Sequence, residues 1–160
     1  MTQQATIPTV RREITVDAPT ERAFAVFTEG MAGWWPRDSH HITEMPAEAH
    51  IEPREGGRCF NRVLRTGEES EWGRVLVYEP PHRLVFAWML THEWGYQPDP
   101  DIASEVEVTF TDAGERRTLV TLEHRGFERE AGGGRAMADQ VGGEGGWDIL
   151  LGLYAGGFTR

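Results

Sequence analysis

The sequence contains no lysine, so all 16 of its basic residues are arginines. Without lysine the chain can form neither the phosphate-binding P-loop nor a Schiff base with a substrate. Its 26 acidic residues outnumber the arginines and give a net charge of −10. An acidic chain without a basic run repels a phosphate backbone, so we expect no nucleic-acid partner. A composition without lysine and rich in arginine and glycine is typical of GC-rich bacterial genomes.

Cysteine and long apolar runs are also scarce. Cys59 is the only cysteine, which excludes an intrachain disulfide and a cysteine-based zinc site. No apolar run approaches the ~20 residues of a membrane span, and residues 1–10 lack the apolar core of a signal peptide. We therefore expect a cytoplasmic protein with no membrane span.

Serine is rare, and none of the three serines lies in a Gly-x-Ser-x-Gly context, which argues against a Ser-His-Asp hydrolase. The adjacent His40 and His41, with Glu44 or His50 nearby, raise the possibility of a metal site. Neighbouring histidine side chains rarely converge on one zinc ion, however, and no His-Glu-x-x-His pattern is present. We predict no metal and no cofactor, and we interpret both histidines as ordinary loop residues.

Large aromatic rings are what the sequence has in quantity: six Trp, seven Phe and three Tyr in 160 residues. Each ring can bury roughly 150–250 Å², so burial is concentrated in a few aromatic walls. The length fits one domain, which we place at residues 10–160 behind a polar, flexible arm at residues 1–9.

The pattern of the chain predicts one strand, two short helices and then six strands. "REITV" alternates like a strand with one wet face, and a helix is expected from about Glu21 to Thr28 with Thr20 as its N-cap. A helical turn follows and ends at Pro36. The six further strands are "AHIEP", "RCFNRVLR", "EWGRVLVYE", "RLVFAWML", "SEVEVTFT" and "RTLVTLEHRGF". Their short links predict an antiparallel meander, and the one long link, residues 92–103, is where we expect a functional loop.

The C-terminal segment carries an amphipathic pattern interrupted by glycine. Trp147, Leu150, Leu151 and Tyr154 follow the spacing of a helix face, but four glycines lie at positions 142, 143, 145 and 146. Within a helix four glycines cost about 4 kcal/mol relative to alanine. Either the helix begins near Gly146, or its first half is weak and packs closely against a neighbour. We expect a C-terminal helix with an irregular start.

The segments "ITVDAPTERAFAVFT", "GWWP", "EPREGGRCF", "GRVLVYEPPHRLVFAW", "SEVEVTFTDAGERRTLVTLEHRGF" and "GWDILLGLYA" together resemble the SRPBCC (START/Bet v 1-like) superfamily. Within it, the chain is similar to the branch named for the activator of Hsp90 ATPase homologue (AHSA1). The resemblance implies an α+β helix-grip fold, in which a curved antiparallel sheet of about seven strands wraps a long C-terminal helix. In that fold a cavity lies between sheet and helix.

Residues on the inward face of such a sheet, and on the helix, are candidates to contact a ligand. Trp34 and Trp35 cannot both point inward from one helical turn, so we expect one ring at the cavity mouth, or else a plug that anchors the turn. Arg58 and Arg62 lie on one face of a strand and either hold a ligand carboxylate or phosphate or pair with a surface glutamate. The predicted ligand-binding residues are Trp34, Trp35, Phe60, Arg62, Trp72, Phe86, Trp88, Trp94, Val108, Phe110, Leu122, His124, Trp147 and Leu151.

These observations leave three functions open. The first is a small-molecule binding protein, monomer or homodimer, that holds an apolar or aromatic ligand without a cofactor. The second is an enzyme similar to polyketide cyclases or dehydratases, in which His124 acts with Glu71 or Glu93. The third is a module that binds a chaperone or another protein. We favour the first, because the sequence contains no complete catalytic constellation.

Overall fold

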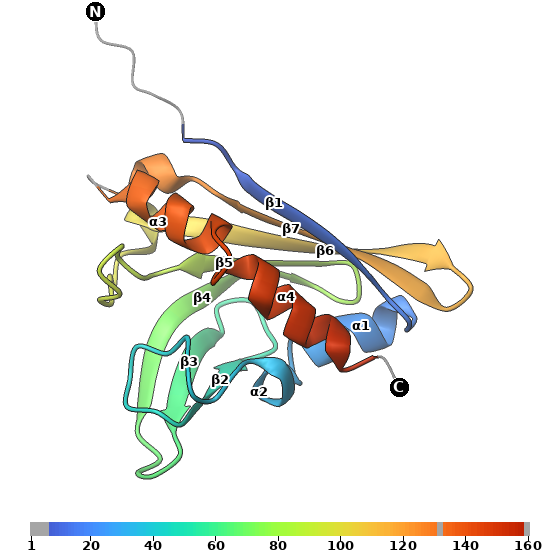
Figure 1. The fold of residues 1–160 in the computed structure, drawn as a ribbon, viewed down its shortest axis with the longest axis horizontal. Helices are drawn as coiled ribbons and strands as arrows, with labels where there is room; N and C mark the ends of the chain where they lie inside the picture. Colours follow the sequence, from blue (N-terminus) through green and yellow to red (C-terminus); the bar gives the residue numbers. More distant parts are fainter. Residues whose placement is uncertain (1–6, 131–132, 159–160) are drawn as a thin grey trace, which may run out of the picture.

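Seven antiparallel strands form one curved sheet in the order β1-β7-β6-β5-β4-β3-β2 (Figure 1). The computed structural model describes residues 7–130 and 133–158. The strands are β1 (Val10–Val16), β2 (Ala47–Ile51), β3 (Arg58–Val63), β4 (Glu69–Glu79), β5 (Arg83–Trp88), β6 (Ser104–Gly114) and β7 (Arg117–Arg125). The helices are α1 (Thr20–Phe27), α2 (Met31–Trp34), α3 (Gly134–Gly142) and α4 (Trp147–Gly156), with 3-10 turns η1 (Pro100–Ile102) and η2 (Phe127–Arg129).

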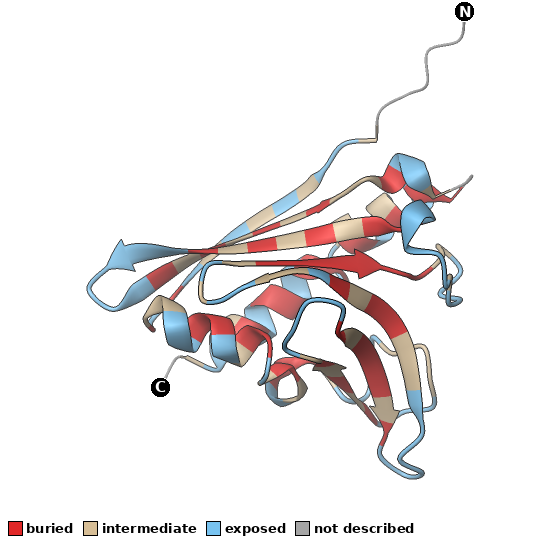
Figure 2. Cartoon of the chain, turned by 180° about the vertical axis from the view of Figure 1, so that it is seen from behind, coloured by how far each residue is buried: buried red, intermediate tan, exposed pale blue. Residues whose placement is uncertain are grey.

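The helices cover one face of the sheet, and the strands alternate accordingly. Along β6 every second residue from Ser104 to Phe110 is buried, and β7 alternates in the same way. The register sets Val108 opposite Leu122 and Phe110 opposite Val120, so the apolar side chains of both strands share the covered face. Figure 2 shows this alternation as red and tan bands along the strands. The predicted α+β helix-grip fold is confirmed, with its curved antiparallel sheet around a C-terminal helix.

The first helix differs from the prediction at its start. Pro19, and not Thr20, occupies the N-cap position, and Thr20 is already helical. The Thr20 hydroxyl contacts the carboxylate of Glu21 at 3.4 Å and caps no backbone N–H group. A proline suits this boundary because its backbone conformation is extended here, with a ψ of 163°.

The C-terminal helix is divided at its glycines into α3 and α4 (Figure 1). Gly146 lies at the division, with φ −97° and ψ −130°, outside the helical range. A Cβ atom at Gly146 would lie 2.1 Å from the carbonyl oxygen of Val141, so the chain passes too close to itself there for any side chain. The glycines therefore allow a sharp break, and α4 starts at Trp147 directly after it.

The covered face of the sheet is packed mainly with aromatic and aliphatic side chains that form one core cluster. Among the residues that the structure describes, no helix has both the length and the apolar character needed to cross a membrane. Most of the expected N-terminal arm lies outside the described residues, and residues 7–9 lead into β1 without regular structure.

Candidate functional site

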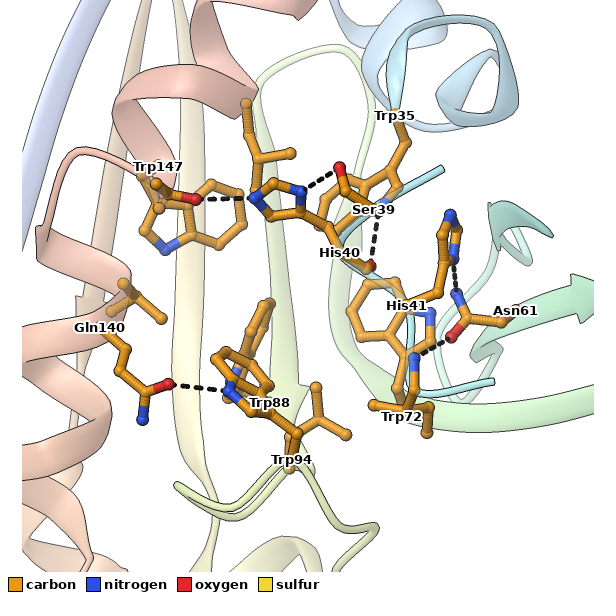
Figure 3. Close-up of a pocket in the computed structure, with 16 residues that line it drawn as sticks. Trp35, Ser39, His40, His41, Asn61, Trp72, Trp88, Trp94, Gln140 and Trp147 are labelled. Carbon is orange, nitrogen blue, oxygen red and sulfur yellow. Dashed lines mark hydrogen bonds between the residues drawn. The ribbon is translucent and has the colours of Figure 1, made fainter. Parts of the chain in front are cut away.

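A cavity of about 420 Å³ opens between the sheet and the break in the C-terminal helix. Three further segments border it: the loop of residues 36–46, the β5–β6 loop of residues 89–103, and Asn61 on β3. Its wall consists of Trp35, Ser39, His40, His41, Ile42, Asn61, Trp72, Trp88, Leu90, Trp94, Gln140, Val141, Gly145, Gly146, Trp147 and Leu150. Figure 3 shows these side chains around the cavity.

Five indole rings form most of the wall. Trp35 stacks on Trp72 with ring centroids 5.8 Å apart, and Trp72 meets Trp88 edge to face at 5.7 Å. Trp88 continues the series to Trp147 at 5.6 Å and to Trp94 at 6.5 Å. These separations are typical of interacting aromatic pairs. The wall is therefore a rigid, mostly apolar surface made of flat rings.

The break between α3 and α4 creates room for the cavity. Gly145 and Gly146 line it, where a continuous helix with side chains would fill the space. Val141 from α3 and Leu150 from α4 border the break on its two sides. The glycines that weaken the helix thus leave a hollow next to the tryptophans.

One rim of the cavity is closed by His40. Its Nε2 atom lies 2.7 Å from the carbonyl oxygen of Gly145, so Nε2 carries the proton and donates it. Its Nδ1 atom lies 2.7 Å from the hydroxyl of Ser39, which donates to it when the ring is neutral. The indole N–H of Trp35 donates to the backbone carbonyl of His40 at 3.0 Å. His40 itself has a positive φ of 64°, an uncommon conformation for a residue with a side chain.

His41, beside it, is held by the protein on both ring nitrogens. Nδ1 accepts a hydrogen bond from the Asn61 amide at 2.8 Å, and Nε2 donates to the carbonyl of Pro36 at 2.6 Å. Burial lowers the pKa of His41 below its ordinary value of 6.5. Asn61 also accepts from the backbone N–H of Ile42 at 3.3 Å. His41 and Asn61 therefore fix the loop against β3.

The opposite rim is fastened by Gln140 of α3. Its Oε1 atom accepts from the indole N–H of Trp94 at 2.7 Å, and its Nε2 atom donates to the carbonyl of His92 at 2.9 Å. One side chain thus ties two points of the β5–β6 loop to the helix. Trp94 has a positive φ of 64° and is 42% exposed, so this loop residue covers the cavity from outside.

His124 is fully buried behind Trp147. The Trp147 indole N–H donates to its Nδ1 at 3.1 Å, and its Nε2 lies 2.8 Å from the Ser104 hydroxyl. An indole nitrogen only donates, so the neutral His124 ring carries its proton on Nε2. Burial lowers the pKa of His124 to about 3. The ring is therefore neutral near pH 7, with both nitrogens occupied inside the protein.

Of the predicted ligand-binding residues, the structure brings Trp35, Trp72, Trp88, Trp94 and Trp147 together at the cavity. The others lie outside its wall: Trp34, Phe60, Arg62, Phe86, Val108, Phe110, Leu122, His124 and Leu151. Trp34 points into the core, where its ring contacts Phe27 and Tyr154 and its indole N–H donates to the carbonyl of Val26.

Phe60 and Arg62 lie on the face of β3 opposite to Asn61. The Phe60 ring is flanked by the guanidinium groups of Arg58 and Arg62, at 4.4 and 5.6 Å from its centroid. Both arginines also pair with the carboxylate of Glu69. The structure thus shows the second of the two roles considered for these arginines, pairing with a glutamate.

The polar residues of the wall were not among the predicted ligand-binding residues. They are Ser39, His40, His41, Asn61 and Gln140. Only the histidines had been considered, and they were interpreted as ordinary loop residues. The loop of residues 36–46 has no regular pattern that indicates which side chains meet the cavity. Within residues 7–130 and 133–158, no three His, Cys, Asp or Glu side chains gather in an arrangement able to hold a metal ion.

Comparison with known proteins gives matches over most of the chain. The sequence model of the family described as activator of Hsp90 ATPase homolog 1-like protein matches residues 17–151. No curated protein matches the chain. A solved structure described as an anthrahydroquino-γ-pyrone synthase, Txn09, is 35% identical with a TM-score of 0.64, and the match covers 94% of this chain and 97% of that one.

Two other solved structures are similar over nearly their full length. The self-sacrificing resistance protein CalC from Micromonospora echinospora is 26% identical with a TM-score of 0.63, and the match covers 94% of each chain. The protein MLL2253 from Mesorhizobium loti, 21% identical with a TM-score of 0.60, covers 93% of this chain and 95% of its own and shares the fold. With a family match over residues 17–151 and the helix-grip architecture, the chain belongs to the activator of Hsp90 ATPase homolog 1-like family within the SRPBCC superfamily.

Proposed function

We propose that the protein binds a flat, polycyclic aromatic molecule in the cavity between the sheet and the broken C-terminal helix. One observation carries the proposal: five indole rings face a cavity of about 420 Å³. That volume lies within the range of pockets that enclose small organic ligands. Flat rings offer faces and edges on which another aromatic ring stacks, and their burial supplies most of the affinity.

The name of one relative supports an aromatic ligand. The 35% identical structure is named as a synthase of an anthrahydroquinone-type γ-pyrone, a fused-ring compound. CalC, 26% identical, is named as a resistance protein. Both similarities extend over nearly the whole chain, so they include the segments that form the cavity. We assign no chaperone role from the family's name alone.

Trp94 offers a clean test, because it lies on the cavity wall and is largely exposed. We expect 1,8-dihydroxyanthraquinone to quench the tryptophan fluorescence of the protein with saturation, and Trp94→Ala to weaken its binding about tenfold. Tyr96 serves as the matched control, since it lies in the same loop, is equally exposed at 42%, and does not line this cavity. Tyr96→Ala should leave the affinity unchanged. Equal effects of the two substitutions, or no saturable binding, would contradict the proposal.

A second candidate function is ring closure on such a ligand, favoured by the identity with a γ-pyrone synthase. His124 has both ring nitrogens engaged behind Trp147, and those of His41 are engaged by Asn61 and Pro36. His40 is the cavity histidine whose Nδ1 contacts only the rotatable hydroxyl of Ser39. In this alternative it removes a proton from a ligand hydroxyl.

A substitution of His40 distinguishes the binding function from the catalytic one. If the protein is an enzyme, His40→Asn abolishes conversion of an anthrahydroquinone substrate, followed by mass spectrometry, while the binding affinity changes less than threefold. His82→Asn is the control, because His82 lies in the β4–β5 turn outside the cavity. If the wild-type protein returns the bound compound unaltered, binding alone is its function.

A further inference from the structure

Two hydrogen bonds lead from the tryptophan-lined cavity to Ser104, which lies near the half-buried carboxylate of Glu130. Trp147 donates to His124 Nδ1, and His124 Nε2–H then donates to the Ser104 hydroxyl. With its oxygen accepting from His124, Ser104 keeps its own hydroxyl proton, and this hydroxyl stabilises the ionised form of Glu130. Trp147, His124 and Ser104 are all fully or almost fully buried. The chain of hydrogen bonds therefore runs from Trp147 to Ser104, beside Glu130.

One oxygen of the Glu130 carboxylate makes no hydrogen bond with the described residues. Glu130 Oε2 is buried and has no hydrogen-bond partner among the residues that the structure describes. Burial raises the pKa of Glu130, and the Ser104 hydroxyl and, to a smaller extent, the nearby His92 act against this by stabilising the ionised form. A buried acceptor without a donor is unfavourable by about 1–3 kcal/mol, and by more when charged. Native proteins rarely leave such a group unpaired unless something else satisfies it.

A smaller cavity of about 220 Å³ lies at this carboxylate. It is lined by Trp88, Leu90, Thr91, His92, Glu93, Gln97, Ile102, Ala103, Glu130 and Gly133. Trp88 and Leu90 also line the larger cavity, so the two cavities adjoin along these side chains. The smaller one is thus placed to take a substituent of a molecule whose rings lie in the larger one.

The chemistry of the smaller cavity suits a cation. Its titratable residues are Glu93, Glu130 and His92, and no arginine lines it. Arg129, next to Glu130 in the chain, is directed to the carboxylate of Glu105 at 3.5 Å. A protonated amine supplies both the charge and the N–H donors that Glu130 Oε2 lacks.

We infer that Glu130 Oε2 receives a protonated amino group of the ligand, in the small cavity beyond Trp88. The inference rests on the proposed function, since it adds an ammonium-bearing substituent, such as an amino sugar, to the aromatic ligand class. Ser104, held by His124, stabilises the ionised carboxylate, and Trp88 lies between the apolar and cationic parts of the ligand.

Three probes with a shared anthraquinone core test this by isothermal titration at pH 7. They are daunorubicin, which carries an ammonium group on its sugar, its uncharged N-acetyl derivative, and the aglycone daunomycinone. We expect daunorubicin to bind about tenfold more tightly than the N-acetyl derivative, as a charged hydrogen bond to a buried carboxylate implies. Glu130→Gln should remove this difference without weakening the N-acetyl derivative. Glu128→Gln, which removes the same charge from the same 3-10 turn at an exposed position outside the cavity, should retain it.

The outcomes distinguish the inference from the function on which it rests. Equal binding of daunorubicin and its N-acetyl derivative to the wild-type protein would overturn the ammonium site and leave aromatic binding intact. Equal losses in Glu130→Gln and Glu128→Gln would also overturn it, because the effect would then be one of overall charge. No binding of any of the three probes would overturn the proposed function and the ammonium site together. The comparison of the two ligands on the wild-type protein does not depend on whether the variants fold.

Discussion

The covered face of the sheet has two ends that are built from similar residues and packed in opposite ways. At the end under α1 and α4, which we call the filled end, the rings of Phe24, Phe27, Trp34, Phe110 and Tyr154 interlock. Phe27 alone contacts Trp34, Phe110 and Tyr154, with centroids between 5.1 and 5.9 Å apart. At the end under α3, which we call the open end, five tryptophans surround a cavity of about 420 Å³.

The two ends also differ in how polar atoms are satisfied. At the filled end the Trp34 indole N–H donates to the carbonyl of Val26, and the Tyr154 hydroxyl donates to that of Ala23 at 2.7 Å. At the open end the indole N–H groups of Trp72 and Trp88 are buried without a hydrogen-bond partner among the described residues. The filled end therefore has the character of a folding core, whereas the open end has unused polar groups typical of a binding site.

The difference arises from the helix more than from the sheet. At the filled end α4 presents Leu151 and Tyr154 to the core, and these side chains occupy the space. At the open end the glycines between α3 and α4 present backbone alone. The divided C-terminal helix thus fills the space over one end of the sheet and leaves a cavity over the other.

Acid should destabilise the protein through His124, which is buried behind Trp147. In the folded protein His124 takes up a proton only near a pKa of about 3, but the unfolded chain does so near 6.5. The unfolded state therefore binds more protons between these values, and stability present above pH 6.5 is lost as the pH falls towards 3. This one group contributes a slope of up to about 1.4 kcal/mol per pH unit.

Urea unfolding of the wild-type protein and His124→Asn across this pH range measures that contribution. The carboxylates titrate alike in both proteins and cancel in the difference. The variant should be less stable at pH 7, with a gap that narrows as the pH falls. Parallel pH profiles would show that His124 does not couple protonation to folding.

Removing a ring from the filled end should cause the next largest effect. Phe27→Ala deletes a fully buried ring that contacts three others, so we expect a loss of about 3–5 kcal/mol in the free energy of unfolding. Trp94→Ala at the open end should lose about 1 kcal/mol or less, because its ring is 42% exposed. Chemical denaturation of both variants measures the two losses in the free energy of unfolding. Similar losses would contradict the difference between the two ends.

Closing the break in the helix should have an intermediate effect. In Gly146→Ala the new methyl group would meet the Val141 carbonyl oxygen at 2.1 Å, so the α3–α4 junction must shift. We expect a loss of about 1–3 kcal/mol together with weaker binding of 1,8-dihydroxyanthraquinone. Thermal unfolding and fluorescence titration measure the two effects, and a variant with unchanged stability and binding would mean that the break tolerates a side chain.

The smallest expected effect is a gain. Gly152 lies within α4, and a Cβ atom there would have no neighbour within 4 Å. Gly152→Ala should therefore stabilise the protein by about 0.5–1 kcal/mol, as expected for glycine in a helix interior. The same thermal unfolding assay measures it. A loss of stability would indicate that this face of α4 requires a glycine.

The strands were predictable because several segments alternate with period two, as in β6 from Ser104 to Phe110, and others are short apolar runs between turns, as in β5. Which face each ring occupies was not predictable to the same degree. The register shifts between Cys59 and Phe60 in β3 and between Val75 and Val77 in β4, and a shift of one residue exchanges the two faces. In β4 the residues passed over by these shifts are Trp72 and Leu76.

The sequence also does not indicate which residues on one face of a strand lie at the cavity and which lie in the core. Phe86 and Trp88 share a face of β5, yet Trp88 borders the cavity and Phe86 packs in the core below Trp72. No periodicity indicates where a helix will leave a gap. The polar rim was hidden for a similar reason, since His40 and Gly145 meet across a separation of 105 positions in the sequence.

The two hydrogen bonds of Gln140 to the β5–β6 loop have a consequence for the kinetics of binding. Trp94 and the carbonyl of His92 are held by opposite atoms of one amide, so the loop leaves α3 only when both hydrogen bonds break. Hydrogen bonds that are equally strong in the free and the bound protein lower the association and dissociation rates of a ligand by the same factor. The dissociation constant therefore does not change. Under the proposed function, Gln140 therefore lengthens the residence time of a ligand without changing its affinity, whereas the tryptophans act on both.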